Sequence, residues 1–484
     1  MKDGECIEMS NQPETDQDIV QQGVHNYSPA ETYVPPTDPA VLEKLEWFQD
    51  QKLALMIHWG LYCQLGIVAS WALSDEDADW SRRQINWTQD PDTFKQQYEG
   101  LIRSFNPIRF QPQEWARMAS DCGFRYLILT TKHHDGFCLW DSQWTDYKVT
   151  SPQCPYHENA HADLVKSMFD AFRKEGLGIG AYFSKADWHT PFYRTPQLPD
   201  SRPSTRGPMY NPQEDPQRWE NFVQYTKNQV LELCKGYGPL DILWFDAGWV
   251  CPQNGQDIRL GEIVQEARRL CPGVLSVDRT VGGPYENYVT PELCIPEKPL
   301  GIPWESCLTL GADFTYEFGD HYKSPRELVN TLVNIVAKGG NLALNVSPQP
   351  DGRIPVEAME SLHGLGQWLR VYGEAIYGTR VCPPYQSGPV SFTRKGDTVY
   401  AIRLYPEARE PVECEVFLPY PGPVRQITFV DSGEAVAFQI RNGGILLTIP
   451  ESRRFANCSC IPDSSLKKTV LQPFDKRGIS PLVF

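Results

Sequence analysis

The stretch Asp241-Ile242-Leu243-Trp244-Phe245-Asp246 decides the fold class of this chain. The run from Asp241 to Phe245 is almost entirely apolar and short. Such a run is typical of a strand that is buried on both faces, as the strands of a parallel sheet are. A carboxylate, Asp246, follows the run directly. The same arrangement, a short apolar run and then a residue capable of chemistry, recurs along the chain.

Short apolar runs alternate with longer helical patterns from about residue 41 to residue 378, which predicts a sheet wound with helices. The expected strands cover Leu53–Ile57, Tyr126–Thr130, Gly178–Phe183, Asp241–Phe245, Val274–Val277 and Asn341–Val346. The expected helices cover Gln113–Asp121, His161–Glu175, Arg218–Tyr237, Ile258–Leu270, Pro325–Ala337 and Val356–Tyr372.

Polar residues collect where these strands end. His58, His133-His134-Asp135, Asp187, Asp246 and Asp278-Arg279 all follow expected strands. In a parallel barrel the carboxyl ends of all strands meet on one face, where the active site of a (β/α)₈ enzyme is built. A doubly wound open sheet would also gather strand ends, but the chain shows no Gly-rich phosphate loop that opens a helix. We therefore expect an α/β fold with a (β/α)₈-like TIM barrel.

The 484 residues are enough for one large domain and a smaller companion. Residues 1–40 are polar and rich in proline, which predicts an extended N-terminal segment. Residues 41–378 would form the barrel domain. Residues 379–484 contain short strand-like runs between turn residues and would form a C-terminal antiparallel β-sandwich. The expected strands there are Thr398–Leu404, Cys414–Leu418, Gln426–Val430 and Gly444–Ile449.

The charge and cysteine content exclude several classes of partner. Acidic residues outnumber basic ones by 61 to 45, and the resulting net charge of −16 disfavours nucleic acid and membrane surfaces. Fourteen scattered cysteines favour reduced thiols over a disulfide framework or a zinc site. Since no export signal is visible, we expect a cytoplasmic protein if the N-terminus is native, and a secreted or periplasmic one if a signal peptide was removed.

Asp246 and His133-His134-Asp135 are the strongest candidates for chemistry. An ionised Asp246 would be a nucleophile, although an aspartate at a strand end can also cap the next helix. The histidines could ligate zinc, but adjacent residues on an extended chain point to opposite sides, so we favour hydrogen bonding over a metal. Plain core histidines are the third interpretation. Candidates for a second carboxylate are Glu286, Glu292, Glu297 and Glu305.

Six motifs in order resemble glycoside hydrolase family 29, the α-L-fucosidases. They lie between residue 46 and about residue 355, and the β domain behind them fits the same family. The motifs are Met56-Ile57-His58-Trp59-Gly60-Leu61-Tyr62, Thr131-Lys132-His133-His134-Asp135-Gly136-Phe137, Leu243-Trp244-Phe245-Asp246, Val277-Asp278-Arg279, Pro303-Trp304-Glu305 and Lys338-Gly339-Gly340-Asn341-Leu342.

The resemblance implies a retaining double displacement in which Asp246 attacks the anomeric carbon and a glutamate protonates the leaving oxygen. It implies no cofactor or metal, and a fucosylated oligosaccharide as the substrate. Arg279 would orient the nucleophile or stabilise its charge. The residues implied to bind the sugar are His58, His133, His134, Tyr182, Trp304 and the pair Asp79-Trp80, where Asp79 replaces the glutamate usual in the family.

The run Val281–Tyr288 resembles the branch of the family that acts on branched α-1,3/1,4-fucosylated glycans. In that branch the general acid aligns with Glu292, and Glu305 is the second choice. Three alternatives remain. The chain could be a glycosidase for a fucose-like sugar such as an α-L-galactoside, which differs from a fucoside only at C6. Trp304 or Trp59 would then line the pocket that receives the C6 group. It could also be a metal-dependent barrel hydrolase, or a catalytically silent sugar-binding protein.

Overall fold

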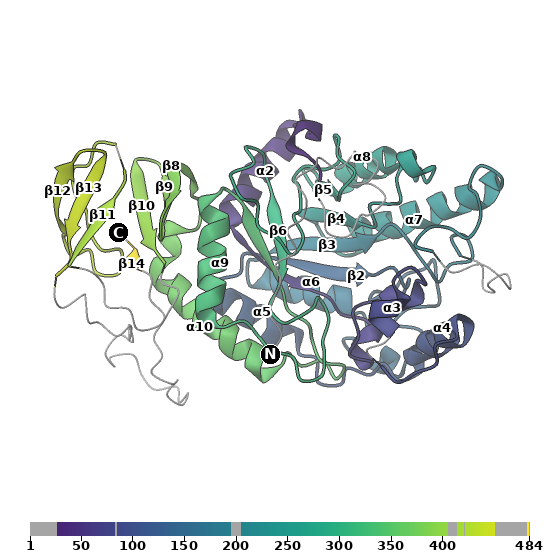
Figure 1. The fold of residues 1–484 in the computed structure, drawn as a ribbon. Coiled ribbons are helices and arrows are strands. Elements are labelled where there is room, and N and C mark those ends of the chain that lie inside the picture. The colour runs from purple at the N-terminus through teal and green to yellow at the C-terminus, as the bar shows by residue number, and fades with distance from the viewer. Residues whose placement is uncertain are drawn as a thin grey trace.

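A curled sheet of seven parallel strands, resembling half of a barrel, forms the centre of the molecule (Figure 1). The structure is a computed structural model and describes residues 27–82, 85–194, 205–404, 414–420, 422–450 and 482–483. The strand order is β5-β4-β3-β2-β1-β7-β6. The bounds are β1 Leu53–Ile57, β2 Tyr126–Lys132, β3 Gly178–Ser184, β4 Ile242–Asp246, β5 Leu275–Asp278, β6 Glu305–Thr309 and β7 Asn341–Asn345.

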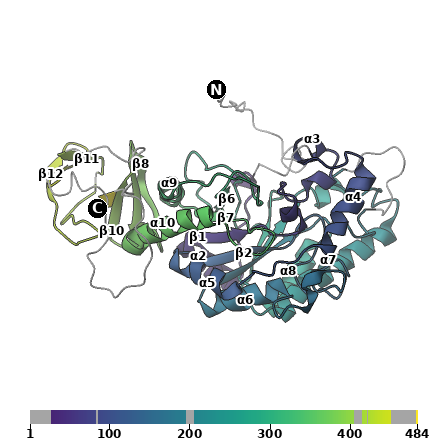
Figure 2. The same cartoon turned by 90° about the horizontal axis from the view of Figure 1, so that it is seen from below.

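Helices alternate with these strands and cover the outside of the sheet (Figure 2). The six predicted helices are confirmed to within three residues at each end, and α9 begins at Pro325 because Ser324 and Glu327 form a capping box. Three helices, α2, α3 and α4, and strand β6 were not predicted. The helix bounds are α2 Pro39–Gln51, α3 Ala78–Ser81, α4 Pro91–Gly100, α5 Pro112–Asp121, α6 Leu164–Lys174, α7 Pro216–Gly236, α8 Leu260–Leu270, α9 Pro325–Ala337 and α10 Val356–Tyr372.

An irregular segment, residues 285–293, takes the place where an eighth strand was expected. On one side the Asn287 amide donates to the Ser276 carbonyl of β5 at 2.9 Å. On the other side the Glu305 amide donates to Val289 at 2.9 Å, which links the segment to β6. Pro291 lies within the segment and has no N–H to give to a ladder. The predicted eight-stranded barrel is thus corrected to seven strands joined at their edges by this closing segment.

Two small antiparallel sheets follow the parallel sheet, and they fit the predicted sandwich. Their inward residues, among them Phe392, Val416 and Leu447, form a shared core. The predicted strand Gln426–Val430 is present only as a bridge at Thr428, and most of the chain after residue 450 lies outside the described residues. The bounds are β8 Arg380–Ser387, β9 Val390–Lys395, β10 Thr398–Arg403 and β14 Leu482–Val483 in one sheet, and β11 Glu415–Leu418, β12 Ala437–Arg441 and β13 Gly444–Thr448 in the other.

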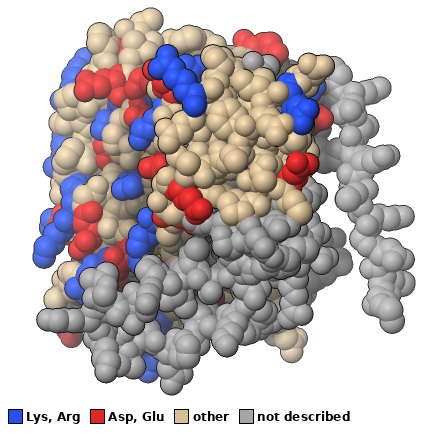
Figure 3. All heavy atoms as spheres, turned by 90° about the vertical axis from the view of Figure 1, so that its left-hand side faces the viewer, with Lys and Arg blue, Asp and Glu red and all other residues tan. Residues whose placement is uncertain are grey.

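Helices α9 and α10 lie between the parallel sheet and the small sheets (Figure 1). Helix α9 contacts β8 and β9, and the Thr393 hydroxyl donates to the Ala375 carbonyl at 2.7 Å. Figure 3 views the end of the molecule that carries the three-stranded sheet, where acidic and basic side chains border an area of uncharged ones. The exposed large apolar side chains of that sheet are Phe417 and Ile440.

Within the described ranges the eleven cysteines are free thiols, and nine of them are buried. Among the helices that the structure describes, none combines the length and the apolar character needed to span a bilayer.

A fully buried ion pair supports the end of β2. Lys132 Nζ lies 3.0 Å from Asp187 Oδ2, and both side chains are completely shielded from solvent. The Tyr225 hydroxyl donates to the same carboxylate at 3.1 Å, and the Thr190 amide donates at 2.9 Å. Since Lys132 immediately precedes His133, this pair fixes the chain where β2 leaves the sheet.

We predict that Lys132→Met lowers the free energy of unfolding by about 3–5 kcal/mol, because Asp187 would remain buried without its cation. Urea unfolding of the purified variant measures this change. Lys166→Met is the matched control: it breaks the exposed Lys166–Asp170 pair and should change stability by less than about 1 kcal/mol. Equal losses in the two variants would contradict the assigned importance of the buried pair.

Candidate active site

A pocket opens among the carboxyl ends of the parallel strands. Strands β1, β3, β4 and β6, the loops that follow β1, β2, β4, β5 and β6, and the closing segment all contribute to it. The side chains that line the pocket are those of Met56, His58, Val68, Ala69, Trp71, His133, Tyr182, Trp244, Asp246, Trp249, Arg279, Glu292, Cys307 and Phe314.

Asp246 is the last residue of β4, and its carboxylate is buried in this pocket. Arg279 Nη1 lies 3.0 Å from Asp246 Oδ1, and the Tyr182 hydroxyl donates to Oδ2. Burial alone would raise the pKa of Asp246, but the Arg279 guanidinium and the Tyr182 hydrogen bond outweigh it and lower the pKa to about 2. The carboxylate is therefore ionised at neutral pH, as a nucleophile must be.

The tautomer of His58 follows from its hydrogen bonds. The Asn345 amide nitrogen donates to the Phe314 carbonyl at 2.7 Å, which fixes the orientation of that amide. Asn345 Oδ1 is thus the atom 2.7 Å from His58 Nδ1, and Nδ1 must carry the proton. This leaves Nε2 of His58 as a hydrogen-bond acceptor.

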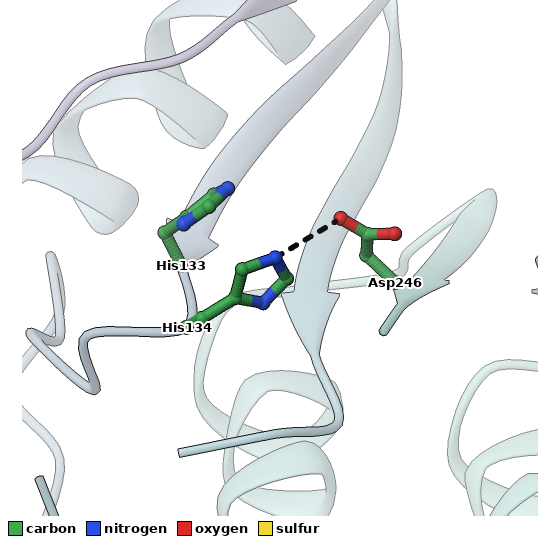
Figure 4. Close-up of side chains that lie close together, drawn as sticks. All are labelled: His133, His134 and Asp246. Carbon is green, nitrogen blue, oxygen red and sulfur yellow. Dashed lines mark ion pairs between the residues drawn. The ribbon is translucent and has the colours of Figure 1, made fainter. Parts of the chain in front are cut away.

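The same reasoning applies to His134. The Ser184 hydroxyl donates to the Ala186 carbonyl, so it accepts from His134 Nδ1 at 2.7 Å. Nε2 of His134 is then a buried acceptor 3.9 Å from Asp246 Oδ2 (Figure 4). Burial lowers the pKa of His134 to about 3, that of His58 to about 4, and that of His133 well below its ordinary value. All three rings are neutral at pH 7 and can hydrogen-bond hydroxyl groups of a substrate.

His133, His134 and Asp246 also form the one group of potential metal ligands found within the described residues. Their ligand atoms all lie within 4.8 Å of one another, which is close enough to hold a cation such as Zn²⁺. However, Asp246 already binds the Arg279 guanidinium, and that positive charge would repel a cation beside it. The residues fit a hydrogen-bonding role better than a metal centre.

Glu292 lies on the closing segment, between β5 and β6, and its side chain lines the pocket. Its carboxylate pairs with Nη2 of Arg279, while Nη1 of the same guanidinium holds Asp246. One cation thus bridges two carboxylates that come from distant parts of the chain. This arrangement suits the separation of about 5–5.5 Å that retaining glycosidases use between their two carboxyl groups.

Two predicted site residues lie elsewhere in the fold. Glu305 is the first residue of β6, next to Asn341 at the amino ends of the strands, where the Tyr126 and Tyr288 hydroxyls donate to it. Trp304 is buried beside Gly340, close to the same ends. Glu305 and Trp304 therefore lie away from the pocket, because β6 begins at Glu305 and its carboxyl end lies further along the chain.

The remaining candidates are placed as follows. Trp59 packs in the core against Phe105, Phe110 and Trp115. Glu297 is exposed, and Glu286 is buried with its carboxylate bound to backbone amides. Asp79 and Trp80 belong to α3, but their side chains lie outside the part that the structure describes.

Sequence reasoning missed the aromatic side chains around His134. The rings of Trp71 and Trp249 lie 4.9 and 5.0 Å from the His134 ring, centroid to centroid. Phe314 lies 5.1 Å from the His58 ring. Trp249 stands three residues after Asp246 and could have been found from that spacing, whereas Trp71 and Phe314 come from loops without a recognisable pattern.

Comparison with known proteins decides the family. A family model described as alpha-L-fucosidase matches residues 20–374. The chain belongs to the α-L-fucosidase family. Human plasma alpha-L-fucosidase is 28% identical to it over 442 residues, which cover 84% of this chain and 85% of that protein.

Solved structures of other α-L-fucosidases share the fold. Isoenzyme 1 from Paenibacillus thiaminolyticus is 30% identical with a TM-score of 0.70, covering 92% of this chain and 98% of its own. The Thermotoga maritima enzyme, solved in complex with fucose, is 29% identical with a TM-score of 0.67 and coverages of 87% and 94%. A Bacteroides thetaiotaomicron family 29 enzyme, solved as a trapped covalent intermediate, is 25% identical with a TM-score of 0.69 and coverages of 86% and 94%.

We predict that Glu305→Gln keeps hydrolytic activity on an aryl α-L-fucoside and changes the pH dependence of stability. Burial raises the pKa of Glu305 to about 7, above the value of about 4.3 expected in the unfolded chain. Between these values the unfolded chain loses the proton and the folded one keeps it, so wild-type stability falls as pH rises. Melting temperatures from pH 4.5 to 7 should fall less steeply in the variant. Loss of turnover with rescue by azide would instead restore Glu305 as the general acid.

Proposed function

We propose that this chain is a retaining exo-α-L-fucosidase that removes terminal α-L-fucose from oligosaccharides or glycoconjugates. The bridge from Asp246 through Arg279 to Glu292 carries the proposal, because it places an ionised carboxylate and a second carboxyl group in one pocket. Membership of the α-L-fucosidase family indicates that the sugar removed is α-L-fucose.

In the first step an Asp246 oxygen attacks the anomeric carbon, and the bond from that carbon to the leaving oxygen breaks. Glu292 gives its proton to the leaving oxygen, and the sugar remains as an ester on Asp246. In the second step Glu292 takes a proton from water, and the water oxygen displaces Asp246 from the anomeric carbon. Two inversions give net retention, and both carboxyl groups return to their starting states.

The neutral histidine rings recognise the hydroxyl groups of the sugar. His58 Nε2 and His134 Nε2 are acceptors for sugar hydroxyls, because their Nδ1 protons are committed to Asn345 and Ser184. The flat faces of Trp71 and Trp249 enclose the sugar and keep water from Asp246 and Arg279, which strengthens their interaction. We assign Tyr182 and Arg279 to holding the charge of the nucleophile.

We further propose that the substrate is a branched α-1,3/1,4-fucosylated glycan. The support is the run Val281–Tyr288, which resembles that branch of the family, and the position of Glu292 just behind it on the closing segment. We also propose that the catalytic domain spans residues 41–378, and that the β domain from residue 379 is a companion to it.

We predict that Asp246→Ala lowers turnover of an aryl α-L-fucoside by on the order of 10³-fold or more, because the covalent intermediate cannot form. Initial rates and the circular dichroism spectrum should be measured together, and the spectrum should stay that of the wild type. Wild-type rates should also survive incubation with EDTA. Wild-type activity that EDTA abolishes and zinc restores would favour the metal-dependent alternative.

We predict that Glu292→Ala loses more activity on fucosylated oligosaccharides than on an aryl fucoside, whose good leaving group needs less protonation. Azide should accelerate the variant by attacking the fucosyl ester, and the product should be α-L-fucosyl azide with retained configuration. Asp246→Ala is the matched comparison, since azide there attacks the substrate directly and gives the β-azide. A β-azide from Glu292→Ala would refute the assignment.

A further inference from the structure

The three charged side chains of the pocket share an unusual backbone feature. Each of Asp246, Arg279 and Glu292 is followed directly by a non-glycine residue with positive φ: Ala247 at 67°, Thr280 at 63° and Leu293 at 52°. The left-handed region is unfavourable for such residues by roughly 1–2 kcal/mol each. Such backbone strain persists where surrounding packing imposes it.

Two of these turns interlock. A Cβ added to Gly248, one residue beyond Ala247, would overlap the Thr280 hydroxyl and lie 2.8 Å from the Arg279 carbonyl oxygen. The Arg279 amide also donates to the Phe245 carbonyl at 3.2 Å. The turn after the nucleophile therefore packs directly on the turn after the arginine, and only glycine leaves room for that approach.

Glu286 holds the second turn from its other side. Its Oε1 accepts from the Thr280 amide at 3.2 Å, and its Oε2 accepts from the Gly282 amide at 2.8 Å and from the Ser28 hydroxyl at 2.5 Å. Thr280 is fully buried between this carboxylate and Gly248. The peptide that carries Arg279 is thus clamped on both sides.

We propose that Gly248 and Thr280 are positioning residues, whose contact sets the Arg279 guanidinium between Asp246 and Glu292. The inference rests on the proposed function, since it concerns how the two carboxyl groups of that reaction are held. Neither residue touches the reacting atoms, and both act through Arg279.

The pH profile reports this role. The charged or titratable groups that face Asp246 come from several strands and from the loops that follow them: His58, His133, His134, Tyr182, Arg279, Glu292 and Cys307. Arg279 is the cation of this set at neutral pH, because the histidines are neutral. If Arg279 moves away, burial dominates and the pKa of Asp246 rises. The acid limb of kcat/KM, which follows the free enzyme, then moves to higher pH.

The test compares Gly248→Ala, Thr280→Gly and the double variant on an aryl α-L-fucoside from pH 3 to 8. Each single variant should lower kcat/KM at pH 7 by about 10–100-fold, the effect of a small misplacement. The pKa of Asp246 in the wild type, about 2, places its acid limb below this range, so an acid limb that appears above pH 3 in the variants marks the rise. Because both changes act on one contact, the double variant should lose little more than the worse single variant. Thr280→Gly should also keep the wild-type melting temperature, since glycine adopts positive φ freely.

Gly366→Ala is the matched control. In α10 a Cβ at Gly366 would lie 2.6 Å from the Cys122 Cα, a comparably tight contact far from the pocket. It should lower the melting temperature and leave the acid limb in place. If Gly248→Ala does not fold, the Thr280→Gly profile decides. Additive losses, or an acid limb that stays fixed in both single variants, would overturn the inference, whereas an inactive wild type would reject the proposed function instead.

Discussion

The rest of the pocket depends on the ion pairs that the Arg279 guanidinium forms with Asp246 and Glu292. Two carboxylates buried in one cavity repel each other and lose their hydration, and a buried charge persists only when a partner compensates it. Arg279 compensates both Asp246 and Glu292, one with each terminal nitrogen. The planar fork of arginine allows this double contact, which the single ammonium of lysine would make with less geometric control.

The surroundings of that cation are polar but neutral. Three buried histidines lie nearby, and burial keeps them uncharged, so they add hydrogen bonds without adding to the positive charge. Asn345 at the end of β7 and Ser184 at the end of β3 fix which nitrogen of His58 and His134 is protonated. The parallel sheet therefore supplies both the charged groups and the residues that orient their neighbours, as its converging strand ends allow.

The sequence was informative where signals were local. Asp246, His133 and Arg279 stand within three residues of the ends of predicted apolar strands, so their common location could be predicted from the pattern alone. Strand β6 was missed because Glu305, Ser306 and Thr309 interrupt its apolar character. Helix α4 was missed because its apolar residues, Phe94 and Tyr98, are few. The contributions of Trp71 and Phe314 depend on how distant loops pack, which local periodicity does not encode.

The positions of Asp246 and Glu292 differ in how freely they can shift during evolution, because Glu292 lies on the closing segment and Asp246 on a strand. Asp246 belongs to a strand whose neighbours on both sides fix its register, so a shift by one residue would turn its side chain to the other face. Glu292 lies on a proline-containing segment joined to β5 and β6 by a few backbone hydrogen bonds. Such a segment tolerates insertion and deletion as loops do. The proposed proton donor, Glu292, can therefore be relocated in descendants of this fold more readily than the proposed nucleophile, Asp246.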